Sequence, residues 1–128
     1  MHGKQYYLES NFKATWHKAQ QVCRQKKMHL ISIHSVEDQE AIEDMMSVIK
    51  FKNRIWTSGT DVDVEGHFVW SETGKPLQYT NWRRNQPDNA GKKEDCLEIC
   101  HDHQWKWNDH QCRDYKTFFI CEAFCQET

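Results

Sequence analysis

Apolar residues recur at helical spacing near the start of the chain. Trp16, Ala19 and Cys23 fall on one face of a segment in which lysine, glutamine and arginine occupy the positions between them. This pattern predicts an amphipathic helix from about Lys13 to Lys27, with its apolar stripe facing the core.

A second helical pattern follows after a short apolar run. Ser35 precedes two acidic residues, which is typical of a helix N-cap with negative charge in the first turn. Four apolar residues then recur on one face of the predicted helix, which ends near Lys50: Ile42, Met45, Met46 and Ile49. The two methionines are interpreted as core residues.

The helical period disappears from Phe51 onward. Short runs of β-branched and aromatic residues alternate there with Gly, Asn, Asp and Pro, which predicts strands joined by long loops. The segment from Asn81 to Glu94 is almost entirely polar, so we expect a surface loop that carries function.

Composition limits the architecture to one modest domain. The chain has 128 residues, of which 38% are hydrophobic, and includes six Trp, six Phe and four Tyr. A chain of this length supports a single core, and large aromatic residues should dominate it. We expect residues 1–5 to be an N-terminal extension or an expression remnant, and residues 6–128 to form one domain.

The six cysteines indicate the cellular compartment, and the formal net charge of −2 limits the classes of partner. An even number of cysteines in so short a chain favours disulfides in an oxidising compartment, so we expect a secreted, extracellular protein. No stretch of 18 apolar residues is present, which predicts no membrane span, and no signal-peptide pattern precedes Tyr6. The slight negative charge argues against nucleic acid as a partner.

Three short motifs carry the candidate chemistry. They are Gln86-Pro87-Asp88, Glu94-Asp95-Cys96 and Trp107-Asn108-Asp109. Carboxylates and side-chain amides supply the hard oxygen ligands that Ca²⁺ prefers, and nearby cysteines can hold such loops in place. Proline fixes the backbone between two polar residues, and a cis X-Pro bond could aim both at one point.

With these motifs the sequence resembles the C-type lectin domain, from about Tyr6 to Ala123. The matching features are the helix containing Trp16 and Cys23, Leu30-Ile31-Ser32-Ile33, Trp56-Thr57-Ser58-Gly59, Phe68-Val69-Trp70-Ser71, the three loop motifs and Phe119-Ile120-Cys121-Glu122. The Trp-Thr-Ser-Gly run looks most like secreted insect members. The resemblance implies an α+β fold: two helices flanking a small, mostly antiparallel sheet, a second short sheet, and long calcium-binding loops.

The resemblance also implies a principal calcium site that binds sugar. Its ligands would be Gln86, Asp88, Glu94, Asn108 and Asp109. Family members with Gln-Pro-Asp resemble binders of galactose and N-acetylgalactosamine, whereas Glu-Pro-Asn accompanies mannose-type ligands.

Many galactose-type members carry a tryptophan just after this tripeptide, to stack on the sugar. Here Asn89 follows Asp88 instead, so Trp105 is our candidate for the stacking residue, with a buried or partly exposed strand residue as the alternative.

An auxiliary calcium site is the second implication. Its residues would be Asp61, Glu65, Asn89, Glu94 and Asp95. Asn89 stands where the family often has a carboxylate, and one charge fewer should weaken the site. The alternative is that Asp61 and Glu65 are ordinary solvated loop acids.

Cysteine pairing is implied in the same way. Cys23 would pair with Cys121, and Cys96 with Cys112. Cys100 and Cys125 remain, either as a third bridge within the chain or as a link between two chains. Because a shallow sugar site binds weakly, we expect dimers or larger assemblies to supply multivalency.

Three other interpretations remain open. The cysteines and histidines between Cys96 and Cys112 could form a zinc site, although disulfides explain the cysteines better. Arg83 and Arg84 could bind an anionic ligand such as a sulfated glycan or phosphate, or they could be ordinary surface residues. The domain could bind protein rather than sugar. No nucleophile triad or phosphate loop is present, and Glu94-Asp95 does not form a glycosidase pair, so we interpret the chain as non-catalytic.

Overall fold

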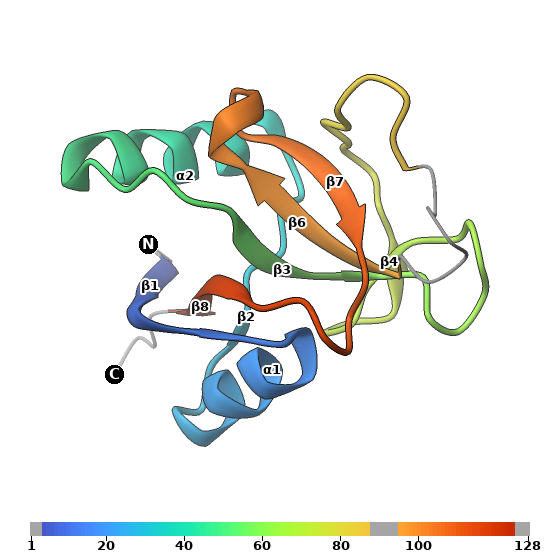
Figure 1. Cartoon of the computed structure of the whole chain (residues 1–128), viewed down its shortest axis with the longest axis horizontal. Helices are drawn as coiled ribbons and strands as arrows, with labels where there is room; N and C mark the ends of the chain where they lie inside the picture. Colours follow the sequence, from blue (N-terminus) through green and yellow to red (C-terminus); the bar gives the residue numbers. More distant parts are fainter. Residues whose placement is uncertain (1–3, 88–94, 125–128) are drawn as a thin grey trace.

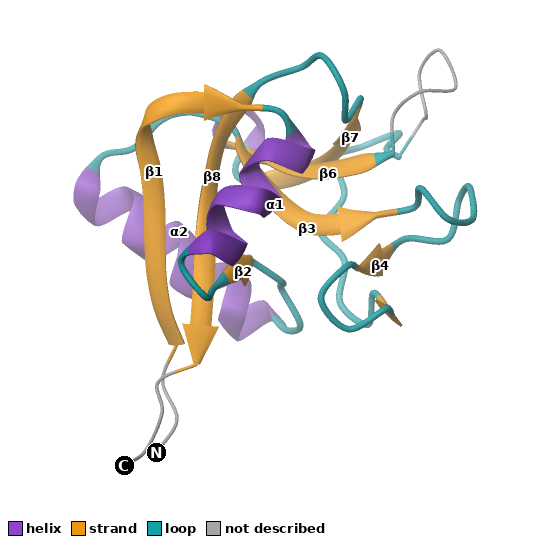
Figure 2. Ribbon diagram, turned by 90° about the horizontal axis from the view of Figure 1, so that it is seen from below, coloured by secondary structure: helices purple, strands orange, loops and turns teal. Residues whose placement is uncertain are grey.

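The computed structural model describes residues 4–87 and 95–124. Two long strands bring the ends of this part of the chain together: β1 (Lys4–Ala14) runs antiparallel to β8 (Thr117–Phe124), with Lys4 opposite Phe124. The short strand β2 (His29–Leu30) pairs with the same part of β8. Helices α1 and α2 lie on opposite sides of the β1–β8 pair in both views (Figures 1 and 2).

Helix α1 (Trp16–Gln25) is shorter than predicted. The predicted apolar stripe is correct, because Trp16, Ala19 and Cys23 are all buried. The start at Lys13 is wrong: the chain through Ala14 belongs to β1, and the Thr15 side chain caps the helix by accepting a hydrogen bond from the backbone N–H of Lys18.

Helix α2 (Val36–Ile49) begins at the predicted N-cap, since the Ser35 hydroxyl accepts from the backbone N–H of Asp38 at 3.2 Å. Ile42 and Met46 are buried, as predicted, but Ile49 is half exposed because the helix ends at Lys50 beyond the edge of the core. Among the described residues, no helix is long and apolar enough to cross a membrane.

Three strands form the part of the sheet that supports the predicted site. Strand β3 (Ile55–Thr60) is buried along its whole length; it pairs parallel with β8 and antiparallel with β6 (Cys96–Cys100). Strand β7 (Lys106–His110) completes an antiparallel hairpin with β6. The second sheet that we expected is therefore joined to the first, in one branched network of eight strands in the described part of the chain.

Short elements connect these strands. Strand β4 (Val69–Trp70) pairs with β3 and with β5 (Lys75–Pro76), and a 3-10 turn, η2 (His101–His103), joins β6 to β7. The main core lies between the sheet and α2. Its largest fully buried side chains include Trp70 and Trp107, whose rings meet edge to face at 5.8 Å.

Both implied disulfides are present. Cys23–Cys121 ties α1 to β8 across a sequence separation of 98, and Cys96–Cys112 closes a segment of 16 residues at the open end of the β6–β7 hairpin. In the chain-entropy model these crosslinks contribute roughly 4–5 and 3 kcal/mol. Together they fix the two ends of the fold between which the site-bearing loops run.

Cys100 does not take either predicted role. It is a free thiol and is fully buried at the end of β6, where its Sγ lies 3.8 Å from Oε2 of Glu98. A thiol at this position cannot reach a second chain while the domain is folded. Its predicted partner, Cys125, lies outside the described residues.

We predict that Cys100 resists alkylation in the native protein. Burial, together with the charge of Glu98, raises the pKa of its thiol to about 12, so the reactive thiolate is scarce at pH 8. Peptide mapping after iodoacetamide treatment should find Cys100 unmodified in the native protein and modified after denaturation without reductant. Rapid native labelling, or a dimer linked through Cys100, would contradict the burial.

Candidate functional site

The polar loop is fastened to β7 by backbone hydrogen bonds. The N–H of Arg83 donates to the carbonyl of Trp107, and the N–H of Trp107 donates to the carbonyl of Asn81, both at 2.8 Å. The N–H of Gln86 donates back to Arg83 at 3.0 Å, and the Gln86–Pro87 bond is cis. The loop is therefore held beside the strand whose next two residues are predicted calcium ligands.

Those two residues, Asn108 and Asp109, lie in the middle of β7 and are buried. Asn108 stands opposite Glu98 in the hairpin, and its Nδ2 donates to Oε2 of Glu98 at 2.9 Å. An amide that donates through nitrogen keeps its carbonyl oxygen as an acceptor or a metal ligand. Glu98 therefore sets which way the Asn108 amide is turned.

Glu98 itself is the centre of a buried polar network. Its carboxylate is fully buried and also receives Nη1 of Arg54 and the hydroxyl of Tyr115, each at 2.8 Å. Burial, with the charge of Glu98, raises the pKa of Tyr115, so its hydroxyl stays protonated as a donor. A charged residue between Leu97 and Ile99 was the signal that our interpretation of the sequence missed.

Arg54 links this network to the hairpin turn. Its Nε and Nη2 bind the two carboxylate oxygens of Asp102 at 3.2 and 3.0 Å. The Arg54 hydrogen bonds hold the pKa of Asp102 below its usual value. One guanidinium thus bridges a buried carboxylate and a surface carboxylate, and its planar set of donors suits both contacts.

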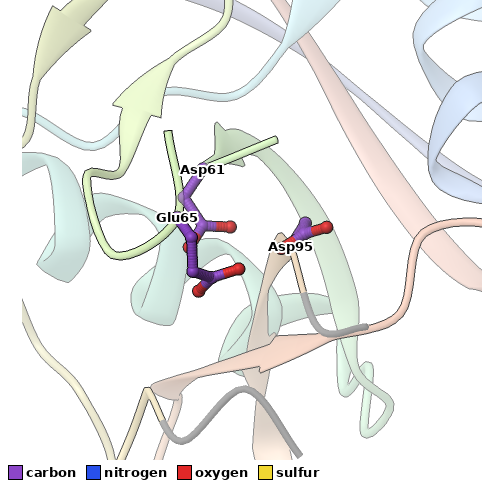
Figure 3. Close-up of side chains that lie close together, drawn as sticks. All are labelled: Asp61, Glu65 and Asp95. Carbon is purple, nitrogen blue, oxygen red and sulfur yellow. The ribbon is translucent and has the colours of Figure 1, made fainter. Parts of the chain in front are cut away.

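A second group of acids lies where β3 and β6 meet the loops. Asp61, Glu65 and Asp95 each offer a carboxylate oxygen within 4.8 Å of the others (Figure 3). Asp61 is buried, Asp95 is partly buried and Glu65 is exposed. These are the three members of the predicted auxiliary site that the structure describes, and it brings them together.

The backbone around Asp61 is fixed. Its N–H donates to the carbonyl of Asp95 at 3.0 Å, and that carbonyl also accepts the Thr60 hydroxyl at 2.7 Å. Gly66 donates its N–H to Oδ2 of Asp61 at 2.8 Å, which closes the loop that carries Glu65. The acids therefore converge because of main-chain bonds and not because of attraction between them.

Within the described part of the chain, two oxygens in this group lack hydrogen-bond donors. Oδ1 of Asp61 and Oδ1 of Asp95 are buried and have no partner within the described ranges. Burial, opposed by the Gly66 N–H but reinforced by Glu65 and Asp95, raises the pKa of Asp61 to about 7. A cation that accepts several carboxylate oxygens fits this arrangement, since it would replace the missing donors and offset the repulsion.

Three of the predicted calcium ligands lie outside the residues that the structure describes. Asp88, Asn89 and Glu94 lie in residues 88–94. The principal site is therefore described through Gln86, Asn108 and Asp109 only.

Trp105 lies at the tip of the β6–β7 hairpin, next to α2. Its carbonyl accepts from Nε2 of Gln39, its indole packs against the core, and its ring meets His101 edge to face at 5.2 Å. These contacts match the alternative of a partly buried structural residue. A stacking role for Trp105 remains a prediction.

The zinc interpretation is wrong for Cys96 and Cys112, because they are bonded to each other. His110 is stacked on Tyr115 with ring centroids 3.6 Å apart. The only cluster of potential metal ligands in the described ranges is the acidic group, whose oxygens suit Ca²⁺ better than Zn²⁺.

Comparison with known proteins agrees with the fold. The family model for the lectin C-type domain matches residues 12–123. The chain belongs to the C-type lectin family. It is 33% identical over 128 residues to C-type lectin mosGCTL-7 of Aedes aegypti, covering 94% of this chain and 84% of that protein.

Solved structures show the same architecture. The carbohydrate-recognition domain of the mouse scavenger receptor C-type lectin superposes with a TM-score of 0.85 and 34% identity, over 98% of this chain and 91% of that one. A calcium-independent type II antifreeze protein superposes with a TM-score of 0.81 and 28% identity, over 94% and 85%. The α+β prediction is thereby confirmed, while the fold alone does not establish calcium binding.

We predict that Tyr115→Phe destabilises the domain by about 1–3 kcal/mol, because it leaves a buried carboxylate oxygen of Glu98 without its donor. Tyr7→Phe is the matched control: its hydroxyl donates to Glu9 at 3.0 Å in a partly exposed position, where water can replace it. Urea unfolding of both variants measures the difference. Equal losses of unfolding free energy in the two variants would contradict a larger contribution from the buried hydrogen bond between Tyr115 and Glu98.

Proposed function

We propose that this protein is a secreted, non-enzymatic lectin that binds galactose-type glycans through Ca²⁺. The observation that carries the proposal is the acidic group at Asp61, Glu65 and Asp95, in which two buried oxygens lack donors from the residues that the structure describes. Membership of the C-type lectin family supports it, because a cation at the loops is then expected to serve sugar binding.

The principal calcium ligands in this proposal are Gln86, Asp88, Glu94, Asn108 and Asp109. The loop–β7 hydrogen bonds and the orientation of Asn108 by Glu98 support the set. When bound, Ca²⁺ supplies coordination positions that two neighbouring sugar hydroxyls can fill. Around it, the carboxylates of Asp88 and Glu94 accept hydrogen bonds from those hydroxyls, and the amides of Gln86 and Asn108 donate to them.

The order of amide and acid in Gln86-Pro87-Asp88 supports galactose and N-acetylgalactosamine over mannose. Exchanging the two groups would reverse which ligand donates and which accepts, so the order selects the arrangement of neighbouring hydroxyls. Asp61, Glu65 and Asp95, with Asn89 and Glu94, form the proposed auxiliary calcium site.

The setting of this activity follows from the same chemistry. Two disulfides in a chain of 128 residues fit an oxidising, extracellular location. A single shallow sugar site binds weakly, so we propose that avidity comes from a homodimer or a larger oligomer. Buried Cys100 makes a non-covalent assembly the better candidate. Innate recognition or agglutination is the role we propose.

The competing function is a protein-binding module that has kept the fold without sugar activity. The likeness to a calcium-independent antifreeze protein is the specific observation in its favour, because that protein has the same fold and is calcium-independent. Calcium-dependent binding of sugar separates the two functions.

We predict that immobilised galactose retains the protein in the presence of calcium and releases it on addition of a chelator, and that immobilised mannose retains it more weakly. Asp109→Asn should abolish retention while leaving thermal unfolding in chelator unchanged, because one ligand charge is removed from a side chain of the same size. Asp44→Asn, at an exposed position on α2, is the control and should bind normally. Retention that survives the chelator or Asp109→Asn would contradict the proposal.

A further inference from the structure

An open hollow of about 450 Å³ lies between the polar loop and the turn of the β6–β7 hairpin. Its lining residues are Arg83, Arg84, Asp102, His103, Gln104 and Lys106. Five of the six carry a basic group or an amide N–H that can donate hydrogen bonds. All six belong to the described part of the chain.

The basic groups come from two segments that are distant in sequence. Arg83 and Arg84 follow Trp82, which bridges to Trp107 of β7, and so the loop is fixed against the hairpin. On the other side, the turn before Lys106 is fixed because Gln104 and Trp105 donate backbone hydrogen bonds to His101 and Cys100 at 3.2 and 2.8 Å. The fold, and not the sequence alone, gathers these cations around one hollow.

The hollow has an excess of positive charge although the whole chain has a net charge of −2. Arg83, Arg84 and Lys106 are three cations, whereas the lining has one carboxylate, Asp102, which is itself hydrogen-bonded to Arg54. The electrostatic field at this hollow therefore favours an anion.

The hollow and the proposed sugar site draw residues from the same two segments of the chain. Arg84 is two residues before Gln86, and Lys106 is two residues before Asn108 on β7. Residues two apart on a strand point to the same face and are separated by about 7 Å. A substituent on a sugar held at the calcium could thus meet a cation without any movement of the backbone.

We propose that this hollow is a subsite for an anionic ester, sulfate or phosphate, carried by the bound glycan. Guanidinium groups match the oxygens of such esters, and the lysine adds a point charge. The inference rests on the proposed function and narrows its ligand class to acidic galactose-type glycans. An ester on carbon 6 is the fitting probe, because it leaves every pair of neighbouring ring hydroxyls free.

The test compares binding of galactose, galactose 6-sulfate and galactose 6-phosphate, all with calcium, to the wild type and to Arg84→Gln/Lys106→Gln. Both side chains are exposed, so the double variant should fold normally. We expect the wild type to bind at least one ester about ten-fold more tightly than neutral galactose, and the variant to bind all three equally. Raising the salt concentration should reduce the ester preference of the wild type.

Two further variants make the comparison specific. Lys18→Gln/Arg24→Gln removes the same charges from exposed positions on α1 and should retain the preference. Arg84→Lys/Lys106→Arg keeps the charge of the hollow, so this variant should retain most of the preference for the sugar ester.

The outcomes separate the two proposals. A wild type that binds neutral galactose with calcium but shows no ester preference, or a preference that survives Arg84→Gln/Lys106→Gln, overturns the subsite and leaves the lectin function intact. A preference lost equally in the α1 variant reduces the effect to net charge and also overturns the subsite. Absence of calcium-dependent binding to all three sugars overturns the lectin function itself.

Discussion

Buried negative charge must be compensated, and this constraint organises the loop end of the protein. A carboxylate removed from water is costly unless hydrogen bonds or a cation replace the lost solvation. Glu98 satisfies this requirement internally, through Arg54, Tyr115 and Asn108. The group at Asp61 and Asp95 does not, because each keeps one buried oxygen without a donor among the described residues.

The Glu98 network and the acidic group at Asp61 and Asp95 are connected through the β6–β7 hairpin. Asp95 directly precedes β6, the strand that carries Glu98, while Asn108 stands opposite Glu98 on β7. The Cys96–Cys112 disulfide closes the same hairpin at the end nearest Asp95. The hairpin therefore carries a buried network whose charge is compensated internally, close in sequence to an acidic group that lacks donors among the described residues. The network orients Asn108, a proposed ligand of the principal site, while the acids belong to the proposed auxiliary site.

Sequence patterns predicted the features that depend on interactions between residues close in sequence. The cap at Ser35, the buried stripe of α1 and the Gln86–Pro87 motif all depend on near neighbours, and the two disulfides follow from the family pattern. The sequence did not predict features that depend on tertiary packing. Lys13 joins a strand because β8 is available to pair with β1, and Cys100 is free because the end of β6 is buried. Likewise, the hollow beside Arg84 requires the hairpin turn to meet the loop.

Thermal unfolding with and without calcium tests the central claim most directly, because a ligand that binds only the folded state stabilises it by mass action. If the uncompensated acids form calcium sites, Tm should rise by about 5 °C or more between excess chelator and millimolar calcium, and Asp61→Asn should reduce this rise. Magnesium at the same ionic strength should produce a smaller shift, since it tolerates such all-protein oxygen sites poorly. An identical Tm in calcium and in chelator would contradict the account.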